Sequence, residues 1–283
     1  MRLTPEFATY IGLAFGVSFN RETVTVMTDD PSMAAPDPAP VRWSLVAQAL
    51  TRPYPVTPSM ILLVSLVPFY IFIAEMMPGR TLHRPEVALD RALPLQPAWA
   101  LVYGSLYLFL ILLPVFVVRQ QEQIRRTVLA YLMIWITAYV CFFIYPTQGP
   151  RPAEVVGQGF AAWGLRFLYS ADPPYNCFPS LHVAHSFVSA LACSRVHRGV
   201  GIAGAVCASL VGLSTLFTKQ HYVLDVLAGI LLAGFAYAVF LRDCPREDNP
   251  DVYRVAPVLA LGLLGALGLA VICSWVVYQG SVG

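Results

Sequence analysis

The chain has 283 residues, of which 57% are hydrophobic and only 12% are charged. A soluble domain carries about 25% charged residues, and a chain of this length with a mean hydropathy of +0.64 has more apolar side chains than one globular core can bury. The formal net charge of +2 is too small to indicate a nucleic acid or a strongly acidic partner. The composition therefore predicts an integral membrane protein without a nucleic-acid partner.

The first 58 residues are predicted to form an arm outside the membrane domain. The apolar stretch at 8–19 is short and is followed by polar residues without a small-residue cleavage site. We therefore expect a short interfacial helix there and not a secretory signal. Residues 28–58 contain seven prolines, a density typical of an irregular loop.

Seven apolar stretches approach the roughly 20 residues that a membrane-spanning helix needs. They are residues 59–77, 98–118, 128–145, 181–194, 200–217, 223–241 and 255–277. The fourth stretch is short and carries His182, His185 and Ser186. We predict an all-α fold, a polytopic bundle of six core transmembrane helices within a catalytic domain at 59–242. A seventh transmembrane helix follows in the C-terminal segment 243–283.

Basic residues in the short loops predict the orientation of the bundle, because these residues favour the cytoplasmic side. The loops after the second, fourth and sixth spans carry Arg119, Arg125, Arg126, Arg195, Arg198, Arg242, Arg246 and Arg254. The opposite face carries Arg80, Arg84, Arg91, Arg151, Arg166 and Lys219. This bias places the loops after the third and fifth spans on the non-cytoplasmic side of an inner or plasma membrane.

The six cysteines do not form a recognisable framework. None belongs to a CxxC pair, and four lie in apolar runs, where a cysteine usually behaves as a small hydrophobic residue. From their spacing we expect neither a disulfide nor a zinc site.

Three polar segments, at residues 145–152, 176–182 and 214–225, lie next to the ends of spans. The alternation of the spans puts all three on one side of the bilayer. In the third segment, His221 and Asp225 are spaced i, i+4, so a helix would bring them into contact. The carboxylate could then orient the imidazole and leave one ring nitrogen free as a nucleophile. An ionisable pair at the head of a membrane span is costly and indicates function.

The other two segments supply groups suited to phosphate. Ser180 follows a proline and precedes an apolar run, so it is predicted to cap a helix. The N-terminus of that helix would present free N–H groups to an anion, with His182 in the first turn. Arg151 lies between two prolines and offers a planar fork for phosphate. Taken alone, Ser180 could be an ordinary cap and Arg151 an arginine that reaches lipid head groups.

Together, these segments resemble the three signature motifs of the type 2 phosphatidic acid phosphatase superfamily, over roughly residues 59–242. The matching residues are Arg151-Pro152, Pro179-Ser180-Leu181-His182 and Ser214…His221…Asp225. The resemblance implies that His221 attacks phosphorus, that Asp225 orients it and that His182 protonates the leaving oxygen. It also implies that Arg151 and Ser180 hold the phosphoryl oxygens. The implied enzyme is an integral-membrane lipid phosphate phosphatase that forms a phosphohistidine and needs no metal or other cofactor.

Three positions depart from the common family pattern. Ile144 stands where a lysine is usual, Thr215 where an arginine is usual, and Leu181 where a glycine is usual. We predict that Lys219, the only lysine of the chain, replaces part of the missing charge; the alternative is that it anchors the chain at the membrane interface. The departures are similar to the inositol phosphorylceramide synthase branch, whose members transfer a phospho-headgroup to a lipid hydroxyl. A lipid phosphotransferase is therefore the alternative function.

Other interpretations compete with this one. His182, His185, His221 and Asp225 could form a metal site. Ionisable residues in spans could line the path of a transporter, although they gather at one surface and no inverted repeat is visible. An inactive relative would lack some of the phosphate-binding residues, but it would be expected to lose the nucleophile first. The lipid substrate and the oligomeric state stay open.

Overall fold

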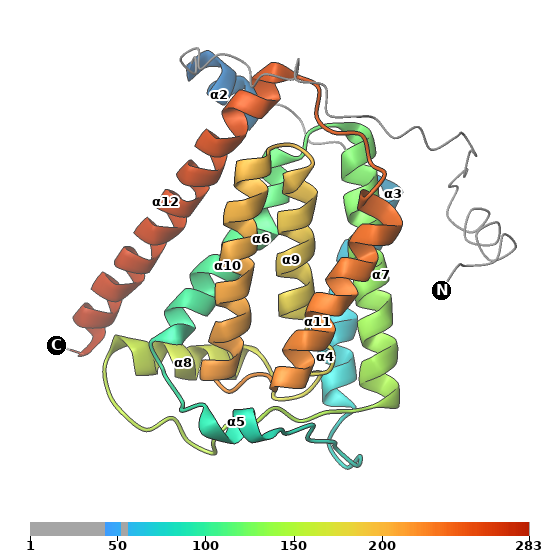
Figure 1. The fold of residues 1–283 in the computed structure, drawn as a ribbon. Helices are drawn as coiled ribbons and strands as arrows, with labels where there is room; N and C mark the ends of the chain where they lie inside the picture. Colours follow the sequence, from blue (N-terminus) through green and yellow to red (C-terminus); the bar gives the residue numbers. More distant parts are fainter. Residues whose placement is uncertain (1–42, 52–55, 283) are drawn as a thin grey trace, which may run out of the picture. The chain divides into compact units, whose positions relative to one another are not determined.

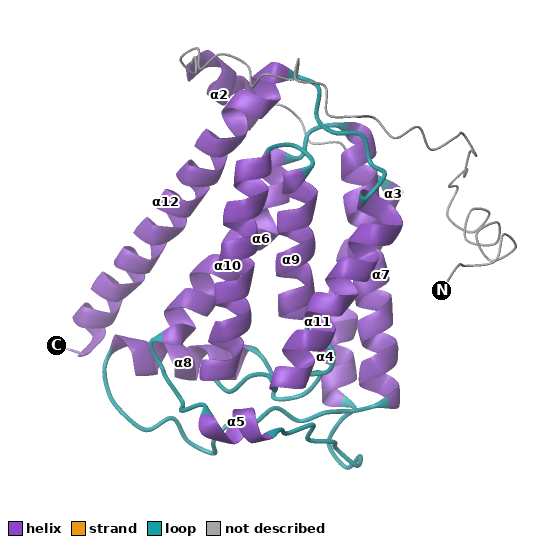
Figure 2. Ribbon diagram, viewed as in Figure 1, coloured by secondary structure: helices purple, strands orange, loops and turns teal. Residues whose placement is uncertain are grey.

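The computed structural model describes residues 43–51 and 56–282 of the chain (Figure 1). Helices make up the regular structure of this part, and it contains no strand, only two isolated β-bridges (Figure 2). The predicted all-α fold is confirmed.

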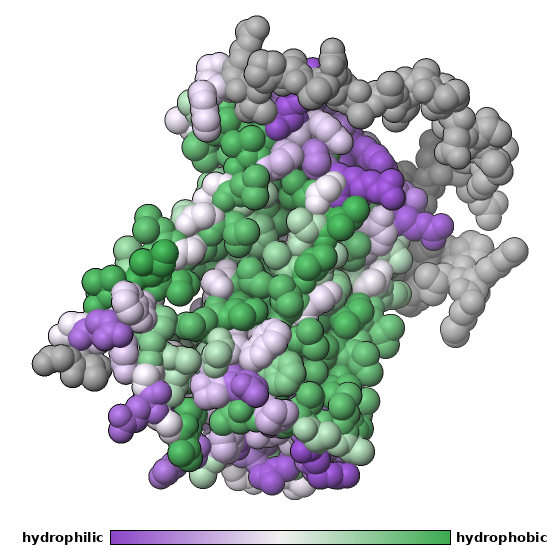
Figure 3. All heavy atoms as spheres, turned by 60° about the vertical axis from the view of Figure 1, so that its left-hand side comes forward, coloured by the Kyte–Doolittle hydropathy of each residue, from purple (hydrophilic) through white to green (hydrophobic). Residues whose placement is uncertain are grey.

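Six helical spans in the described residues are long and apolar enough to cross a membrane. They comprise α3 (Pro58–Ser65) with α4 (Val67–Glu75), α6 (Trp99–Val117), α7 (Gln121–Ile144), α10 (Arg198–Phe217), α11 (Val223–Ala236) with the π-helix η1 (Tyr237–Leu241), and α12 (Pro250–Val282). A seventh apolar helix, α9 (Leu181–Ser194), is shorter. On the face drawn in Figure 3, hydrophobic residues cover the middle of the helices and hydrophilic residues gather towards both ends. The protein is an integral membrane protein.

Two boundaries differ from the hydropathy pattern for identifiable reasons. The first span is interrupted at Leu66, because Pro68 in the first turn of α4 has no N–H to continue the ladder of α3. Helix α7 begins at Gln121, seven residues before the apolar run at 128. Its polar first turns are held by Glu122, whose carboxylate pairs with Arg125 at 2.9 Å and with Arg126 at 2.6 Å.

The prediction of irregular backbone over residues 28–58 is wrong for Trp43–Thr51, which form helix α2. No proline falls within these residues, and the prolines that suggested a loop flank them. The interfacial helix predicted at 8–19 lies outside the described residues.

Helix α9 lies among α6, α7, α10 and α11, so the residues at its N-terminus face the centre of the bundle (Figure 1). A Cβ atom at Gly229 of α11 would stand 2.7 Å from the carbonyl oxygen of Ser180. Glycine at this position therefore allows α11 to approach the start of α9 closely. This contact brings the second and third polar segments together.

Two short helices at the same end of the bundle were not predicted. Helix α5 (Ala88–Ala92) lies in the loop before α6, and α8 (Phe160–Ala171) lies in the loop between α7 and α9. Figure 1 shows both across the ends of the spans, where the three polar segments also meet.

Candidate active site

His221 and Asp225 make the predicted contact, although not as two residues of one helix. Tyr222 is the N-cap of α11, so His221 precedes the helix and Asp225 occupies its third position. The Asp225 side chain reaches back, so that its Oδ2 lies 3.4 Å from His221 Nδ1 and accepts the Tyr222 N–H at 2.9 Å. Both side chains are buried. The Asp225 carboxylate thus caps its own helix and also orients the His221 imidazole.

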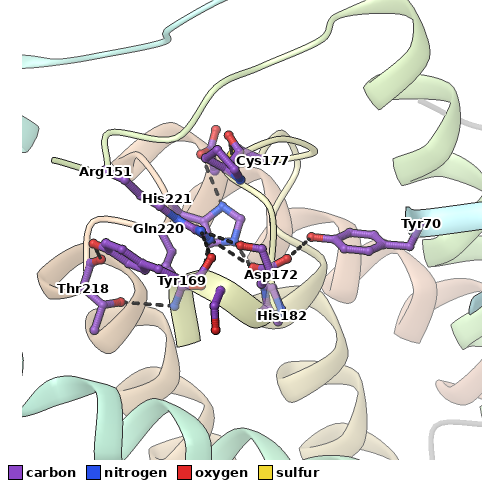
Figure 4. A network of polar contacts seen from close by, with 12 residues as sticks. Tyr70, Arg151, Tyr169, Asp172, Cys177, His182, Thr218, Gln220 and His221 are labelled. Carbon is purple, nitrogen blue, oxygen red and sulfur yellow. Dashed lines mark hydrogen bonds and ion pairs between the residues drawn. The ribbon is translucent and has the colours of Figure 1, made fainter. Parts of the chain in front are cut away.

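The second ring nitrogen of His221 faces His182. His221 Nε2 lies 3.2 Å from His182 Nδ1, a hydrogen-bond distance (Figure 4). Because an ionised carboxylate can only accept, His221 Nδ1 carries the proton that faces Asp225. Its Nε2 then holds the lone pair, which accepts the N–H of His182. The structure therefore joins Asp225, His221 and His182 in one line of polar contacts.

Two tyrosines of α6 form an aromatic wall against His182. The rings of Tyr103 and Tyr107 meet the His182 ring edge-on, at centroid distances of 5.3 and 4.8 Å. The two residues are one helical turn apart, so both rings come from one face of α6. Sequence reasoning missed them, because aromatic residues in an apolar span resemble ordinary core.

Ser180 is the N-cap of α9, as predicted. Its Oγ accepts the N–H of Val183 at 3.4 Å, and its own N–H donates to the Asp225 carbonyl oxygen at 3.0 Å. The side chain is fully buried. The hydroxyl thus orders the helix start beside His182, while its contact with a phosphate stays a prediction.

Arg151 is held by acceptors on several sides. Its Nη1 donates to the carbonyl oxygens of Asp172, at 2.5 Å, and Tyr169, at 3.4 Å. Its Nη2 donates to Asp172 Oδ2 at 3.2 Å and to Gln220 Oε1 at 3.4 Å. The guanidinium also lies over the Tyr169 ring, 4.6 Å from the centroid. Its Nε is buried and has no hydrogen-bond partner among the described residues. This nitrogen is the guanidinium donor left for an anion.

Asp172 and Gln220 join the candidate site without having been predicted. Asp172 pairs with Arg151 and also accepts the Tyr70 hydroxyl at 2.8 Å, which links the first span to the site. Gln220 is the neighbour of His221 and connects it to Arg151. A carboxylate in the predicted non-cytoplasmic loop was a signal that could have indicated Asp172.

Hydrogen bonds to a threonine hydroxyl join the first and second polar segments. Thr147 Oγ1 accepts the N–H groups of Cys177, at 3.0 Å, and Phe178, at 3.1 Å. A Cβ atom at Gly149 would stand 2.8 Å from the Gln220 carbonyl oxygen, so this position allows the third segment to approach as well. All three predicted segments therefore meet at one end of the bundle.

The hydrogen bond that the structure shows for the Lys219 side chain does not involve His182 or His221. Its ammonium donates to the carbonyl oxygen of Asp90 at 2.8 Å, and its backbone adopts a positive φ of 54°. Its replacement of a missing phosphate ligand stays a prediction. The observed contact ties the loop before His221 to helix α5.

Asp90 stabilises the start of α11. Its carboxylate accepts the N–H of Val223, the first residue of α11, and the N–H of Val87, both at 2.8 Å. Asp90 is buried and lies in the short helix α5. It therefore fixes the start of the helix that carries Asp225.

The structure brings together a set of possible metal ligands that differs from the predicted one. The indole N–H of Trp135 donates to His185 Nε2, and the Tyr131 ring lies 4.8 Å from the His185 ring, so His185 belongs to the packing of α7 against α9. The group of possible ligand atoms that does lie close together consists of Cys177, His221 and Asp225.

Two ionisable groups outside the spans stay neutral near neutral pH. Burial raises the pKa of Tyr169 to about 12, against the opposing effect of Arg151, and the hydroxyl donates to the Thr218 carbonyl oxygen at 2.5 Å. Burial, and after it the negative charge of Asp225, raises the pKa of the Cys177 thiol well above its usual range. Tyr169 therefore acts as a hydrogen-bond donor and Cys177 as a thiol.

A polytopic helical membrane protein with a paired-histidine centre and an arginine at one end of its bundle is the class that this fold and site define. Within that class, the chain belongs to the PAP2 superfamily, whose family model matches residues 81–239, more than half of its length. All six predicted catalytic and phosphate-binding residues fall inside the matched segment.

A relative supports the same assignment. The chain is 27% identical over 115 residues to a PA-phosphatase related-family protein of Dictyostelium discoideum. The match covers 35% of this chain and 21% of the relative, so the chain spans about a fifth of that protein's length. No solved structure matches the chain.

Proposed function

We propose that the protein is a lipid phosphate phosphatase that cleaves a phosphate ester through a phosphohistidine at His221. One observation carries the proposal: the His221 ring lies between Asp225, 3.4 Å from Nδ1, and His182, 3.2 Å from Nε2. A nucleophile, the group that orients it and a proton donor are thereby adjacent.

In the first step, the Nε2 lone pair of His221 forms a bond to phosphorus and the bond from phosphorus to the lipid oxygen breaks. His182, doubly protonated at this stage, gives one ring proton to the departing oxygen and becomes neutral. A phosphoryl group cannot fit between two nitrogens at hydrogen-bond distance, so substrate binding must turn the His182 ring away from His221. Water then attacks phosphorus with His182 as the general base, the N–P bond breaks and phosphate leaves.

Arg151 would stabilise the charge on the phosphoryl oxygens, because phosphoryl transfer depends on positioning and electrostatic stabilisation. Its Nε has a free N–H, whereas Asp172 and Gln220 already occupy Nη2. A phosphate would bind at Nε and compete with the Asp172 carboxylate for Nη2.

The lipid would enter from the leaflet at the catalytic end. Helix α8 presents a stack of aromatic rings there, with Phe160 next to Trp163 and Trp163 next to Phe167, and Tyr278 of α12 packs against it. Such rings are typical of the membrane–water interface. The arginine bias of the loops supports a non-cytoplasmic site in an inner or plasma membrane.

A lipid phosphotransferase is the second candidate. Its first step would be the same, and a lipid hydroxyl would replace water in the second. Thr215, which stands in place of the usual arginine, favours this candidate: its hydroxyl donates to the Gly212 carbonyl oxygen at 2.7 Å within the buried end of α10, so this position supplies no cation.

The test is phosphate release in the presence of a chelator by the purified protein and by His221→Ala. The panel would contain phosphatidate, a polyprenyl diphosphate, phosphatidylglycerol phosphate and a phosphosphingolipid. We expect release to fall at least about a thousandfold in the variant, because the nucleophile is removed. Labelled substrate should leave an acid-labile phosphoprotein with the wild type alone.

His197→Asn is the matched control, because His197 caps α10 at the opposite end of the bundle. Its turnover should equal that of the wild type. Turnover by His221→Ala at the wild-type rate would overturn the mechanism. If no lipid of the panel releases phosphate, head-group exchange between labelled lipids would test the transferase.

A further inference from the structure

Three potential metal ligands from two polar segments lie close together, and one of them is a member of the histidine pair. Cys177, His221 and Asp225 each contribute one ligand atom, and these atoms lie within 4.8 Å of one another. All three residues are buried, with exposed fractions of 3%, 4% and 0%. Figure 4 shows Cys177 beside the His221 ring.

A second observation concerns the carboxylate of the same cluster. Asp225 Oδ2 is engaged by the His221 ring and by the Tyr222 N–H, but Asp225 Oδ1 has no hydrogen-bond partner in the part of the chain that the structure describes. A buried carboxylate oxygen without a partner is costly, and such an oxygen requires an explanation. A bound cation would satisfy it.

The donor set selects among cations. A sulfur, an imidazole nitrogen and a carboxylate oxygen together are typical ligands of zinc, whereas magnesium and calcium prefer oxygen alone. We propose that Cys177, His221 and Asp225 bind a zinc ion that inhibits the enzyme by occupying the nucleophilic imidazole. The inhibition rests on the proposed function of His221, but the binding does not.

The geometry requires only local adjustment. With zinc–ligand distances of 2.0–2.3 Å, tetrahedral ligands lie roughly 3.3–3.8 Å apart, so the atoms of this cluster need to approach by about 1 Å. The contact of the Cys177 sulfur with the Pro174 carbonyl oxygen is long, at 3.8 Å, and zinc binding would replace it. The thiol would lose its proton on binding, and water would fill the fourth position.

Such a site would make zinc an inhibitor of a reaction that itself needs no metal. Zinc would bind His221 Nδ1, the ring nitrogen beside Asp225. The ring proton would then move to Nε2, which would have no lone pair left to form a bond to phosphorus. Chelators should therefore preserve or raise turnover. Cys177 is the member of the cluster that the proposed reaction does not use. Its substitution therefore tests metal binding without removing a catalytic group.

The test compares the wild type with Cys177→Ala, and Cys193→Ala serves as the control because Cys193 is also buried but lies near the far end of α9. Zinc, buffered by a chelator, should inhibit the wild type and Cys193→Ala equally. Cys177→Ala should keep its metal-free turnover and need at least about ten times more zinc. Equal zinc sensitivity of all three proteins would overturn the proposal.

Cobalt binding gives a readout that is independent of activity. Co²⁺ added to the wild type should produce a thiolate-to-cobalt charge-transfer band, and the band should be absent in Cys177→Ala and weakened in His221→Ala. Zinc should also raise the Tm of the wild type but not that of Cys177→Ala. Absence of the band in the wild type would refute the site, even if the protein proved to have another activity. A band with undiminished turnover would refute the inhibition.

Discussion

At the scale of single residues, Arg151, the proposed phosphate ligand, already has partners in the structure. The side chain of Arg151 has an exposed fraction of only 8%, and its Nη nitrogens are taken up by Asp172, Tyr169 and Gln220. The ion pair with Asp172 holds the guanidinium in place, but it also cancels part of the charge that a phosphate would meet.

Asp172→Asn tests which of these effects is larger. Asparagine keeps the size of the side chain and an acceptor, but it removes the negative charge, so the phosphate seat becomes more cationic. We expect KM, and the inhibition constant of inorganic phosphate, to fall severalfold. The measurement is phosphate inhibition of turnover.

Tyr70→Phe serves as the control, because it removes only the hydroxyl that donates to Asp172. Weaker phosphate inhibition in Asp172→Asn than in the wild type would contradict the prediction. It would show that Asp172 acts chiefly to position Arg151.

At the scale of secondary-structure elements, the start of α11 depends on an unexpected cap. Asp225 accepts the Tyr222 N–H from within the helix, and Asp90 of α5 accepts the Val223 N–H from 133 residues away in sequence. The helix start, and with it the placement of Asp225 against His221, therefore depends on the loop around α5.

Asp90→Ala should lower both stability and turnover. The change leaves two backbone N–H groups without their acceptor, and the loss of a cap of this kind costs about 1–2 kcal/mol. A lower Tm and reduced turnover are expected, measured with Asp90→Asn alongside. Asparagine retains an acceptor, so it should recover most of the loss. Equal Tm values for Asp90→Ala and the wild type would contradict this assignment.

At the opposite end of the bundle, His197 makes the cap of α10 sensitive to pH. Its Nδ1 accepts the Val200 N–H at 3.2 Å, and burial lowers its pKa below the usual value. Because the folded pKa lies below the unfolded one, the cap contributes fully above about pH 6.5. The contribution is lost as the pH falls through the folded pKa, since protonation removes the acceptor.

The expected result is a Tm that decreases more steeply below about pH 6.5 in the wild type than in His197→Asn. Asparagine caps a helix equally well but does not titrate in this range. Parallel pH profiles for the two proteins would show that His197 does not control this end of the helix.

At the scale of the whole molecule, hydropathy predicts the spans because the bilayer imposes their length and their apolar surface. It misses elements that do not depend on the bilayer. Helix α2 lies between prolines, the first turns of α7 are charged, α5 is short, and α8 is amphipathic. These elements are formed by local hydrogen bonds, ion pairs and packing at the ends of the bundle.

From its sequence alone, the membrane class of this protein, its family and the contact between His221 and Asp225 could be predicted. These properties follow from hydropathy and from short spacings such as that of His221 and Asp225, which are local in the chain. The cap at Ser180 was predictable for the same reason.

The tertiary structure decided which atoms face one another. The contact between His182 and His221 joins residues 39 apart in sequence, and the contact between Arg151 and Gln220 joins residues 69 apart. The partners of Arg151, the contact of Lys219 with Asp90 and the place of Cys177 beside Asp225 likewise depend on how helices and loops pack. Sequence spacing cannot predict these contacts, because they form where separate helices and loops approach one another.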